Sequence, residues 1–193
     1  MSLRLAAVVL AGGEGRRMGG SKPLRAWREG TLLEEALRKA RRFAPDVAVA
    51  VRSADQVGLV DAPLLIDRAD LAGPLSGLAS AVAFAESVGA EAVLTAPCDA
   101  PLLPEDLAGR LAEALTAGQG VAMPVSHGQW QPACALWRST LAAALADYAA
   151  RGGRSLRGFA EEAGLRLVDW GAPEPDPFAS ANTPEDLYRL SRT

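Results

Sequence analysis

Apolar segments of strand length alternate with segments of helical periodicity along the chain, and this alternation constrains the fold more than any other feature. The strand candidates span residues 5–10, 47–51, 63–66, 92–96, 121–125, 133–137 and 165–169. The helix candidates span residues 32–43, 75–87, 105–117, 141–149, 156–163 and 184–190. Four strand candidates lack the polar–apolar alternation of a half-exposed strand, so they should be buried on both faces. The pattern predicts an α/β fold of three layers, in which helices cover both faces of a mostly parallel sheet.

Local signals place several boundaries of these elements. Thr31 and Glu34 have the spacing of a capping box, which predicts that a helix begins at residue 32. Thr183, followed by Pro184 and two acidic residues, indicates the start of the last helix. The segment VSHGQWQP at residues 125–132 lies between two apolar runs and indicates a hairpin, which would place one antiparallel strand in the sheet.

Composition bounds the class of protein. The 193 residues contain no repeat, low-complexity tract or linker, so we expect a single domain over residues 1–193. A net charge of −3 provides no general attraction to nucleic acid or to an anionic membrane surface. No apolar run approaches the ~18–20 residues that span a bilayer. Cys98 and Cys134 belong to no CxxC or Cys/His cluster, which favours reduced structural cysteines in a cytoplasmic protein.

The segment LAGGEGRRMGGSKP at residues 10–23 follows the first strand candidate and is rich in glycine and cationic side chains. It nearly matches two phosphate motifs, but Met18 replaces the third glycine of GxGxxG, and Ser21 separates glycine from Lys22 in the P-loop pattern. Both motifs share one mechanism: glycines let backbone N–H groups face phosphate oxygens, and cations neutralise the charge. A flexible surface turn with solvated arginines is the alternative.

The position of Lys22 favours the phosphate-binding interpretation. Lys22 and Lys39 are the two lysines among the 20 lysine and arginine residues. Lysine is a compact point charge and arginine a planar fork, so a triphosphate site can require lysine specifically. We expect the glycine-rich segment to be exposed in the free protein, so that Lys22→Ala weakens nucleotide binding more than it changes folding.

Two aspartates each follow a predicted buried strand directly. Asp67 follows PLLI and Asp99 follows AVLTAPC, so both should face the crevice at the carboxyl ends of the strands, as should the glycine-rich segment. Carboxylates beside a cationic loop suit a nucleoside triphosphate with Mg²⁺, because Mg²⁺ takes one or two carboxylates together with phosphates and waters. We expect Asp99 to bind the metal and Asp67 to contact the ribose or a second metal. Each aspartate alone could instead be a turn residue or a helix cap.

Four motifs carry a resemblance to a known family: LAGGEGRRMGGSKP at 10–23, DRADLAGPLSGL at 67–78, TAPCDAPLLP at 95–104 and FASANTPEDL at 178–187. In this order and approximate spacing, the chain resembles the molybdenum cofactor guanylyltransferases over essentially its whole length. The resemblance implies a three-layer Rossmann-like nucleotidyltransferase fold. It also implies transfer of GMP from GTP to the terminal phosphate of molybdopterin cofactor, with Mg²⁺ as cofactor and pyrophosphate as the second product.

The resemblance further implies a role for each matching residue. The implied GTP contacts are Leu10, Ala11, Gly12, Gly13, Lys22, Asp67 and Asp99. The implied molybdopterin contacts are Gly20, Arg154 and Asn182. The residues implied in catalysis are Arg17, Lys22 and Asp99, of which Asp99 would also bind Mg²⁺. Partners would be GTP and molybdopterin cofactor, together with cofactor-insertion enzymes or chaperones of acceptor molybdoenzymes.

The residue types of the chain agree with transfer of a nucleotidyl group to a phosphate acceptor. Because the acceptor is already an anionic phosphate, alignment and charge neutralisation at the α-phosphorus suffice, and no protein nucleophile is required. We therefore expect the single histidine, His127, to have a structural or solvent-exposed role. Trp130 and Trp137 are candidates to stack on a pterin, although core packing is the better interpretation of Trp137.

Two departures keep alternatives open. Ala50 stands where some relatives place an asparagine that contacts the nucleotide, and Ser180 stands where some have another asparagine near the acceptor. One alternative is a cytidylyltransferase of the same cofactor or a sugar-1-phosphate nucleotidylyltransferase. A further alternative is a noncatalytic nucleotide-binding partner in cofactor assembly, against which the presence of Lys22 and Asp99 argues.

Overall fold

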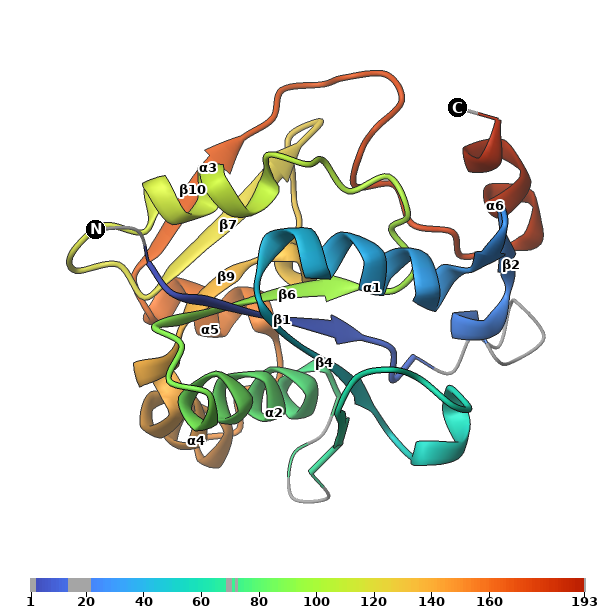
Figure 1. The fold of residues 1–193 in the computed structure, drawn as a ribbon. Coiled ribbons are helices and arrows are strands. Elements are labelled where there is room, and N and C mark those ends of the chain that lie inside the picture. Colours follow the sequence, from blue (N-terminus) through green and yellow to red (C-terminus); the bar gives the residue numbers. More distant parts are fainter. Residues whose placement is uncertain (1–2, 14–21, 69–70, 72, 193) are drawn as a thin grey trace.

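A computed structural model of the chain describes residues 3–13, 22–68, 71 and 73–192, and it contains the predicted three-layer arrangement (Figure 1). The main sheet runs in the order β10-β7-β9-β6-β1-β4-β5. Its strands are β1 (Leu5–Leu10), β4 (Asp46–Val51), β5 (Leu64–Ile66), β6 (Ala92–Pro97), β7 (Val121–Ser126), β9 (Leu136–Arg138) and β10 (Leu165–Asp169), and β8 (Gln129–Trp130) pairs with β7. The helices are α1 (Leu32–Phe43), α2 (Pro74–Ser87), α3 (Leu107–Ala114), α4 (Ala142–Ala150), α5 (Leu156–Glu162) and α6 (Pro184–Ser191).

The sheet is parallel except at β8 and β9. β1 pairs in parallel with β4 and β6, and β10 pairs in parallel with β7. β9 runs antiparallel to both of its neighbours, β6 and β7. The predicted hairpin is the β7–β8 connection, where His127 and Gly128 both have positive φ, at 49° and 70°. Two adjacent residues with positive φ form the turn that suits the right-handed twist of a hairpin.

The central strands are continuous apolar runs because both of their faces lie in the core. In β1, Ala7 and Val9 pack into the layer between the sheet and helices α1 and α3. Ala6 and Val8 pack into the opposite layer, with apolar residues of α2, α4 and α5. Figure 1 shows α1 and α3 on one face of the sheet and α2 and α4 on the other. Both faces are therefore buried, as the missing alternation predicted.

A small second sheet and the C-terminal helix form a third apolar cluster beside the main core. β2 (Ala26–Trp27) and β3 (Gly30–Thr31) pair antiparallel directly before α1. Trp27 packs with Leu32 and with two residues from the end of the chain, Ala181 and Leu190. Figure 1 shows α6 beside β2, so the last residues of the chain lie next to residues that follow the glycine-rich segment.

Several predicted boundaries need correction. The strand expected at 133–137 is a 3-10 helix over Pro132–Cys134 followed by β9, because Pro132 cannot donate a backbone hydrogen bond to the sheet ladder. The helix expected at 105–117 is shorter, since Leu115 leaves the helical conformation at φ −82° and ψ 68°. The helix bounds at 32–43 and the strand bounds at 5–10 and 165–169 are confirmed.

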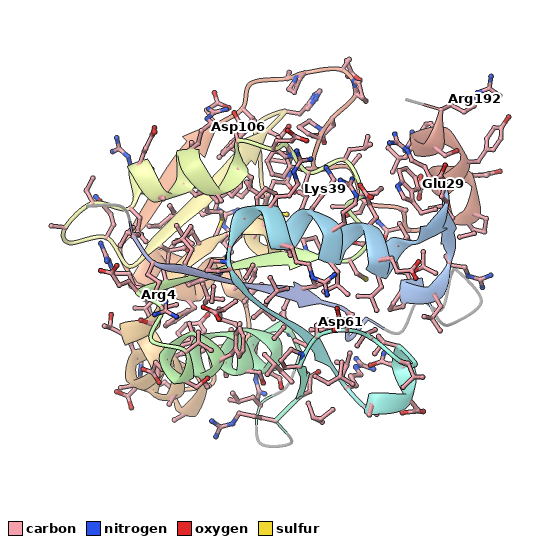
Figure 2. All side chains as sticks on the ribbon, viewed as in Figure 1. Arg4, Glu29, Lys39, Asp61, Asp106 and Arg192 are labelled. Carbon is pink, nitrogen blue, oxygen red and sulfur yellow. The ribbon has the colours of Figure 1, made fainter. Side chains whose placement is uncertain are left out.

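Charged side chains are distributed over separate parts of the fold. Figure 2 shows Asp106 at the start of α3 and Arg192 at the end of α6 on different sides of the molecule, and Asp61 apart from both. Among the residues that the structure describes, no helix is long and apolar enough to cross a membrane.

Candidate nucleotide site

The carboxyl ends of four parallel strands meet at one edge of the sheet and define the candidate site. β1 lies between β4 and β6, so the chain leaves β1 in one direction and later returns on its other side. In open α/β sheets, ligands bind outside the strand ends at such a switch point. The predicted residues 10–13, Asp67 and Asp99 all lie at this edge.

A pocket of about 310 Å³ opens between the ends of β1, β4 and β5 and the start of α2. Its lining residues are Leu10, Gly12, Gly13, Ala50, Arg52, Asp67, Gly73, Pro74 and Gly77. The structure thus brings together four predicted nucleotide contacts, Leu10, Gly12, Gly13 and Asp67. Ala11 lies behind them: its side chain is buried, and its N–H donates to the Ala50 carbonyl at 2.8 Å.

Glycine suits two points of this pocket, Gly12 and Gly73. A Cβ at Gly12 would lie 3.3 Å from Asp67 Oδ2, which is closer than most real Cβ contacts. Gly73, with φ of 68°, is the N-cap of α2, and Pro74 occupies the first turn. The backbone at Gly73 can therefore turn tightly into α2 at the pocket wall.

Asp67 is held at the pocket by the pairing of the strand that precedes it. Its backbone N–H donates to the Val51 carbonyl at 2.8 Å, which continues the pairing of β5 with β4. Burial raises the pKa of the Asp67 carboxyl, while a hydrogen bond from Ser76 and the charge of Arg52 oppose that rise. The net upward shift of the pKa indicates a carboxylate that lacks full solvation and would gain from hydrogen-bond donors on a ligand.

The second part of the site is a buried cluster of Lys22, Asp99 and Asn182. Lys22 Nζ forms an ion pair with Asp99 Oδ2 and donates to Asn182 Oδ1 at 2.9 Å. The side chains of Lys22 and Asp99 are only 11% and 17% exposed. The expectation of an exposed glycine-rich segment is therefore wrong at Lys22, because the lysine contacts the carboxylate and the amide. Residues 14–21 of that segment lie outside the described residues. Lys22, which we expect to bind the phosphates, thus contacts both Asp99, expected to bind the metal, and Asn182, expected to contact the acceptor.

The C-terminal segment positions Asn182 in this cluster. The backbone N–H of Ala181 donates to the Asp99 carbonyl at 2.8 Å. The N–H groups of Asn182 and Thr183 donate to Asp186 Oδ2, and the Asp186 N–H donates to the Thr183 hydroxyl. This capping box of α6 fixes the backbone of Asn182, so the helix start predicted at Thr183 has a direct consequence for the site.

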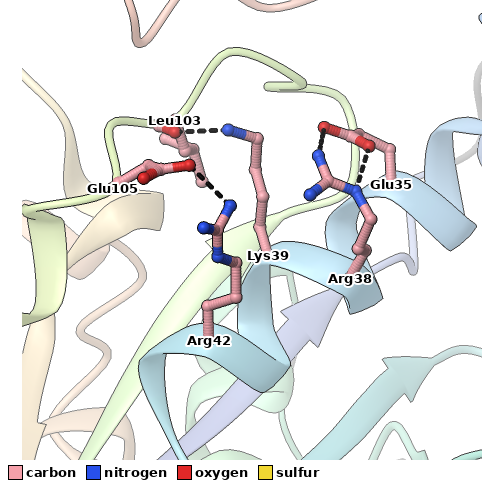
Figure 3. Close-up of polar contacts among 6 residues, drawn as sticks. All are labelled: Glu35, Arg38, Lys39, Arg42, Leu103 and Glu105. Carbon is pink, nitrogen blue, oxygen red and sulfur yellow. Dashed lines mark hydrogen bonds and ion pairs between the residues drawn. The ribbon is translucent and has the colours of Figure 1, made fainter.

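The segment that carries Asp99 is anchored to α1 on its far side. Figure 3 shows Lys39 Nζ donating to the Leu103 carbonyl, at 2.6 Å, and Arg42 paired with Glu105, at 2.5 Å. Burial lowers the pKa of Lys39. In the same view Arg38 binds Glu35 through two hydrogen bonds within α1. The loop after β6 is therefore bound both by Lys22 at Asp99 and by Lys39 at Leu103.

The donor set of the cluster fits a divalent cation. The Asp99 carboxylate and the Asn182 amide oxygen both accept from a single ammonium group, so the two oxygens already converge on a positive charge. Among the described residues no group of three or more His, Cys, Asp or Glu is placed to hold a metal. Mg²⁺ commonly takes only one or two protein carboxylates and completes its shell with phosphates and waters.

One other predicted residue in the described part of the chain, Arg154, does not join this cluster. Arg154 lines a separate groove of about 490 Å³ between α2 and α4, which also includes Arg68. Arg17 and Gly20 lie outside the described residues. The prediction missed Arg52 and Ser76, although Arg52 follows a strand as directly as Asp67 does, and that position alone could have identified it.

The remaining candidates have structural environments. Trp137 is fully buried, and its indole N–H donates to the Thr95 hydroxyl at 3.1 Å, which confirms core packing. His127 lies in the β7–β8 turn, where its backbone N–H donates to the Gly171 carbonyl at 2.7 Å. Cys98 and Cys134 are free and buried, as predicted, and burial raises the pKa of Cys98 to about 12.

Fold and site together suit a nucleotide-binding α/β domain, because a buried lysine lies beside a carboxylate at the strand ends where open α/β sheets bind ligands. This is the arrangement expected of a nucleotidyltransferase. Comparison with known proteins gives the same class, since the model of the MobA-like NTP transferase domain matches residues 7–166. The "Molybdenum cofactor guanylyltransferase" of Cereibacter sphaeroides is 38% identical over 192 residues, covering 97% of this chain and 95% of the relative. That of Pasteurella multocida is 35% identical, covering 97% and 99%. The chain belongs to the molybdenum cofactor guanylyltransferase family.

Solved structures show the same fold. The molybdopterin-guanine dinucleotide biosynthesis protein A of Archaeoglobus fulgidus matches with a TM-score of 0.78 at 22% identity, over 97% of each chain. The 2-C-methyl-D-erythritol 4-phosphate cytidylyltransferase of Thermus thermophilus matches with a TM-score of 0.70 at 20% identity, over 100% of each chain. Because these two relatives differ in the substrates that their names state, the fold by itself does not select the base.

Proposed function

We propose that this chain transfers GMP from GTP to the terminal phosphate of molybdopterin cofactor, forming molybdopterin guanine dinucleotide and releasing pyrophosphate. The observation that carries the proposal is the Lys22–Asp99–Asn182 cluster beside a glycine-walled pocket, in a chain of the guanylyltransferase family. Cytidylyl transfer is not favoured, because the full-length relatives at 35–38% identity are named as guanylyltransferases.

The chemistry follows from charge and alignment. An oxygen of the acceptor phosphate attacks the α-phosphorus of GTP, the new P–O bond forms, and the bond to the β-phosphate breaks as pyrophosphate leaves. The α-phosphorus reaction needs in-line placement and neutralisation of negative charge rather than a protein nucleophile. Lys22 provides a cation at the carboxyl edge of the sheet, and we assign it to the phosphates.

The free protein keeps this cation paired until the nucleotide arrives. In the structure Lys22 is neutralised by Asp99 and hydrogen-bonded to Asn182. Phosphate oxygens can replace those partners, because they are also anionic acceptors of charge-assisted hydrogen bonds. Release of Lys22 would leave the Asp99 carboxylate able to bind a second cation.

We assign that second cation to Mg²⁺, held by Asp99 together with the phosphates of GTP. When bound, Mg²⁺ neutralises charge on the phosphates and orients them. We assign Arg17 to the phosphates and Gly20 to the acceptor, both from the family pattern. Asn182 and Arg154 are the further acceptor contacts, with Asn182 next to the phosphate site and Arg154 at the α2–α4 groove.

We also propose the setting in which the protein acts. GTP and molybdopterin cofactor are its partners, and the dinucleotide product must pass to a further protein, for which cofactor-insertion enzymes or chaperones of acceptor molybdoenzymes are suited. A cytoplasmic location agrees with two unpaired, buried cysteines.

Acceptor-dependent release of pyrophosphate tests the proposal. Purified protein with GTP, Mg²⁺ and molybdopterin cofactor should release pyrophosphate, and omission of the acceptor should abolish the release. An absence of release with an acceptor that a known guanylyltransferase accepts in parallel would reject the enzyme assignment. In that case nucleotide binding without turnover would favour a noncatalytic partner.

A further inference from the structure

The nucleotide pocket contains a pair of opposite charges at its rim, contributed by Arg52 and Asp67. The other lining residues are glycines, a proline and the aliphatic residues Leu10 and Ala50. Ala50 has no polar side-chain atom to offer a base. Polar side-chain recognition within this lining must therefore come from the arginine and the aspartate.

Backbone pairing places these two side chains next to each other. Val51 of β4 pairs with Ile66 of β5. Arg52 directly follows Val51, and Asp67 directly follows Ile66, so the two residues lie at the ends of neighbouring strands. Both side chains also border Gly12: a Cβ there would lie 3.3 Å from Asp67 Oδ2 and 3.6 Å from Arg52 Cγ. The Arg52 N–H donates to Gln56 Oε1 at 2.8 Å, which fixes the backbone from which its side chain extends.

The electrostatics of the pair agree with a role in binding. The charge of Arg52 acts on Asp67 and favours its ionised form, although burial raises the pKa of that carboxyl overall. The carboxylate therefore retains a capacity to accept further hydrogen bonds, which Ser76 alone does not exhaust.

From this geometry we propose that Arg52 is a specificity-determining residue, and that Arg52 and Asp67 together read the guanine base. Asp67 accepts hydrogen bonds from guanine N1–H and the 2-amino group, while Arg52 donates to O6 and N7. This donor and acceptor order matches guanine and mismatches cytosine, which presents an amino donor where guanine presents O6. The inference rests on the proposed function, because it assumes that the pocket holds the base of GTP.

Calorimetric titration of the full chain with four nucleotides tests the inference. The nucleotides are GTP, 7-deaza-GTP (which lacks the N7 acceptor), ITP (which lacks the 2-amino group) and CTP. The unmodified protein should bind GTP more tightly than each of the others. Arg52→Ala should weaken GTP binding by about tenfold to a hundredfold, the worth of one bidentate arginine–guanine contact. In that variant GTP and 7-deaza-GTP should bind equally, while GTP should still bind more tightly than ITP.

Two further variants separate base reading from simple charge attraction. Arg52→Lys keeps the charge but loses the planar fork, so its preference for GTP over 7-deaza-GTP should be smaller than that of the unmodified protein. Arg4→Ala, which removes an exposed arginine that pairs with Asp46 at the opposite, amino-terminal ends of β1 and β4, should leave all four affinities unchanged.

The outcomes that overturn the inference are distinct from failure of the proposed function. If Arg52→Ala keeps the unmodified protein's preference for GTP over 7-deaza-GTP, or weakens GTP and CTP equally, Arg52 does not read the base. If the unmodified protein binds CTP more tightly than GTP, the proposed function itself fails and the inference fails with it.

Discussion

The two lysines of the chain bind the same loop, yet their partners give them different roles. Lys22 contacts the loop after β6 through the carboxylate of Asp99, and Lys39 contacts it through the backbone carbonyl of Leu103. A carboxylate can exchange the ammonium for a metal or release it to a phosphate. The backbone carbonyl of Leu103 carries no charge and has no comparable alternative. We infer from this comparison that a ligand can displace Lys22 from its partner, whereas Lys39 only stabilises the fold.

Neither lysine is a free surface charge in the absence of ligand. Lys22 is 9% exposed, and burial lowers the pKa of Lys39. Burial of the ammonium therefore does not distinguish the functional lysine from the structural one. The chemistry of the partner does, because a carboxylate and an amide oxygen are also able to hold a metal ion, whereas the backbone carbonyl of Leu103, among the described residues, already accepts from Lys39 alone.

The largest expected effect is on the partner of Lys22. Asp99→Asn should lower the rate of pyrophosphate release by about a hundredfold or more, because it removes the carboxylate assigned to Mg²⁺. Mn²⁺ binding to the GTP complex, followed by electron paramagnetic resonance, should weaken in parallel. Unchanged turnover together with unchanged Mn²⁺ affinity would show that Asp99 does not hold the metal.

Replacing each lysine in turn tests whether the two have different roles. Lys22→Ala should abolish most GTP binding and also lower the free energy of unfolding by about 1–3 kcal/mol, because Asp99 loses its partner. Lys39→Ala, the matched control, should cost a similar ~1–3 kcal/mol in urea denaturation but leave GTP affinity within about twofold. Equal losses of GTP affinity in the two variants would contradict the division of roles.

Removal of the third member of the cluster should have a smaller effect. Asn182→Ala deletes a hydrogen bond to a charged group and should lower turnover by about tenfold. Asp186→Ala leaves Asn182 in the chain but removes the capping box that fixes its backbone, so it should lower turnover less while destabilising the chain by about 0.5–2 kcal/mol. Turnover that falls further in Asp186→Ala than in Asn182→Ala would place the important contact elsewhere in α6.

The smallest effect on folding is expected at Asp67. Because its pKa is raised in the folded state, the ionised carboxylate is less favourable there than in the unfolded chain, so folding stability should increase as pH falls through the raised pKa. Asp67→Asn should therefore leave the melting temperature at pH 7 unchanged or higher, while GTP binding weakens. In the unmodified protein GTP affinity should fall over the same acidic range. A clear drop in melting temperature at pH 7 would assign Asp67 a structural role.

Local signals predicted most of the fold. The capping box at Thr31 predicted the start of α1, and continuous apolar runs predicted the buried strands. The two-residue strands β2 and β3 were not predicted, because such short segments have no periodicity to detect. The break at Pro132 was missed because the apolar residues after it resemble a strand in composition.

The site was predictable in its parts but not in its contacts. Strand-end positions identified Asp67 and Asp99, because each residue follows an apolar strand of a parallel sheet. The contact of Lys22 with Asn182 joins residues 160 positions apart and depends on how α6 packs against Trp27. Tertiary packing of this kind leaves no local pattern, so the sequence alone could not show that the lysine is buried.

Competition between nucleotides in one reaction tests the central claim most directly. Purified protein would be incubated with equimolar GTP and CTP, Mg²⁺ and limiting molybdopterin cofactor, and the products identified by mass spectrometry. We predict a product in which the cofactor has gained GMP, formed together with one equivalent of pyrophosphate. A product that has gained CMP, or GTP hydrolysis with no nucleotide joined to the cofactor, would contradict the account.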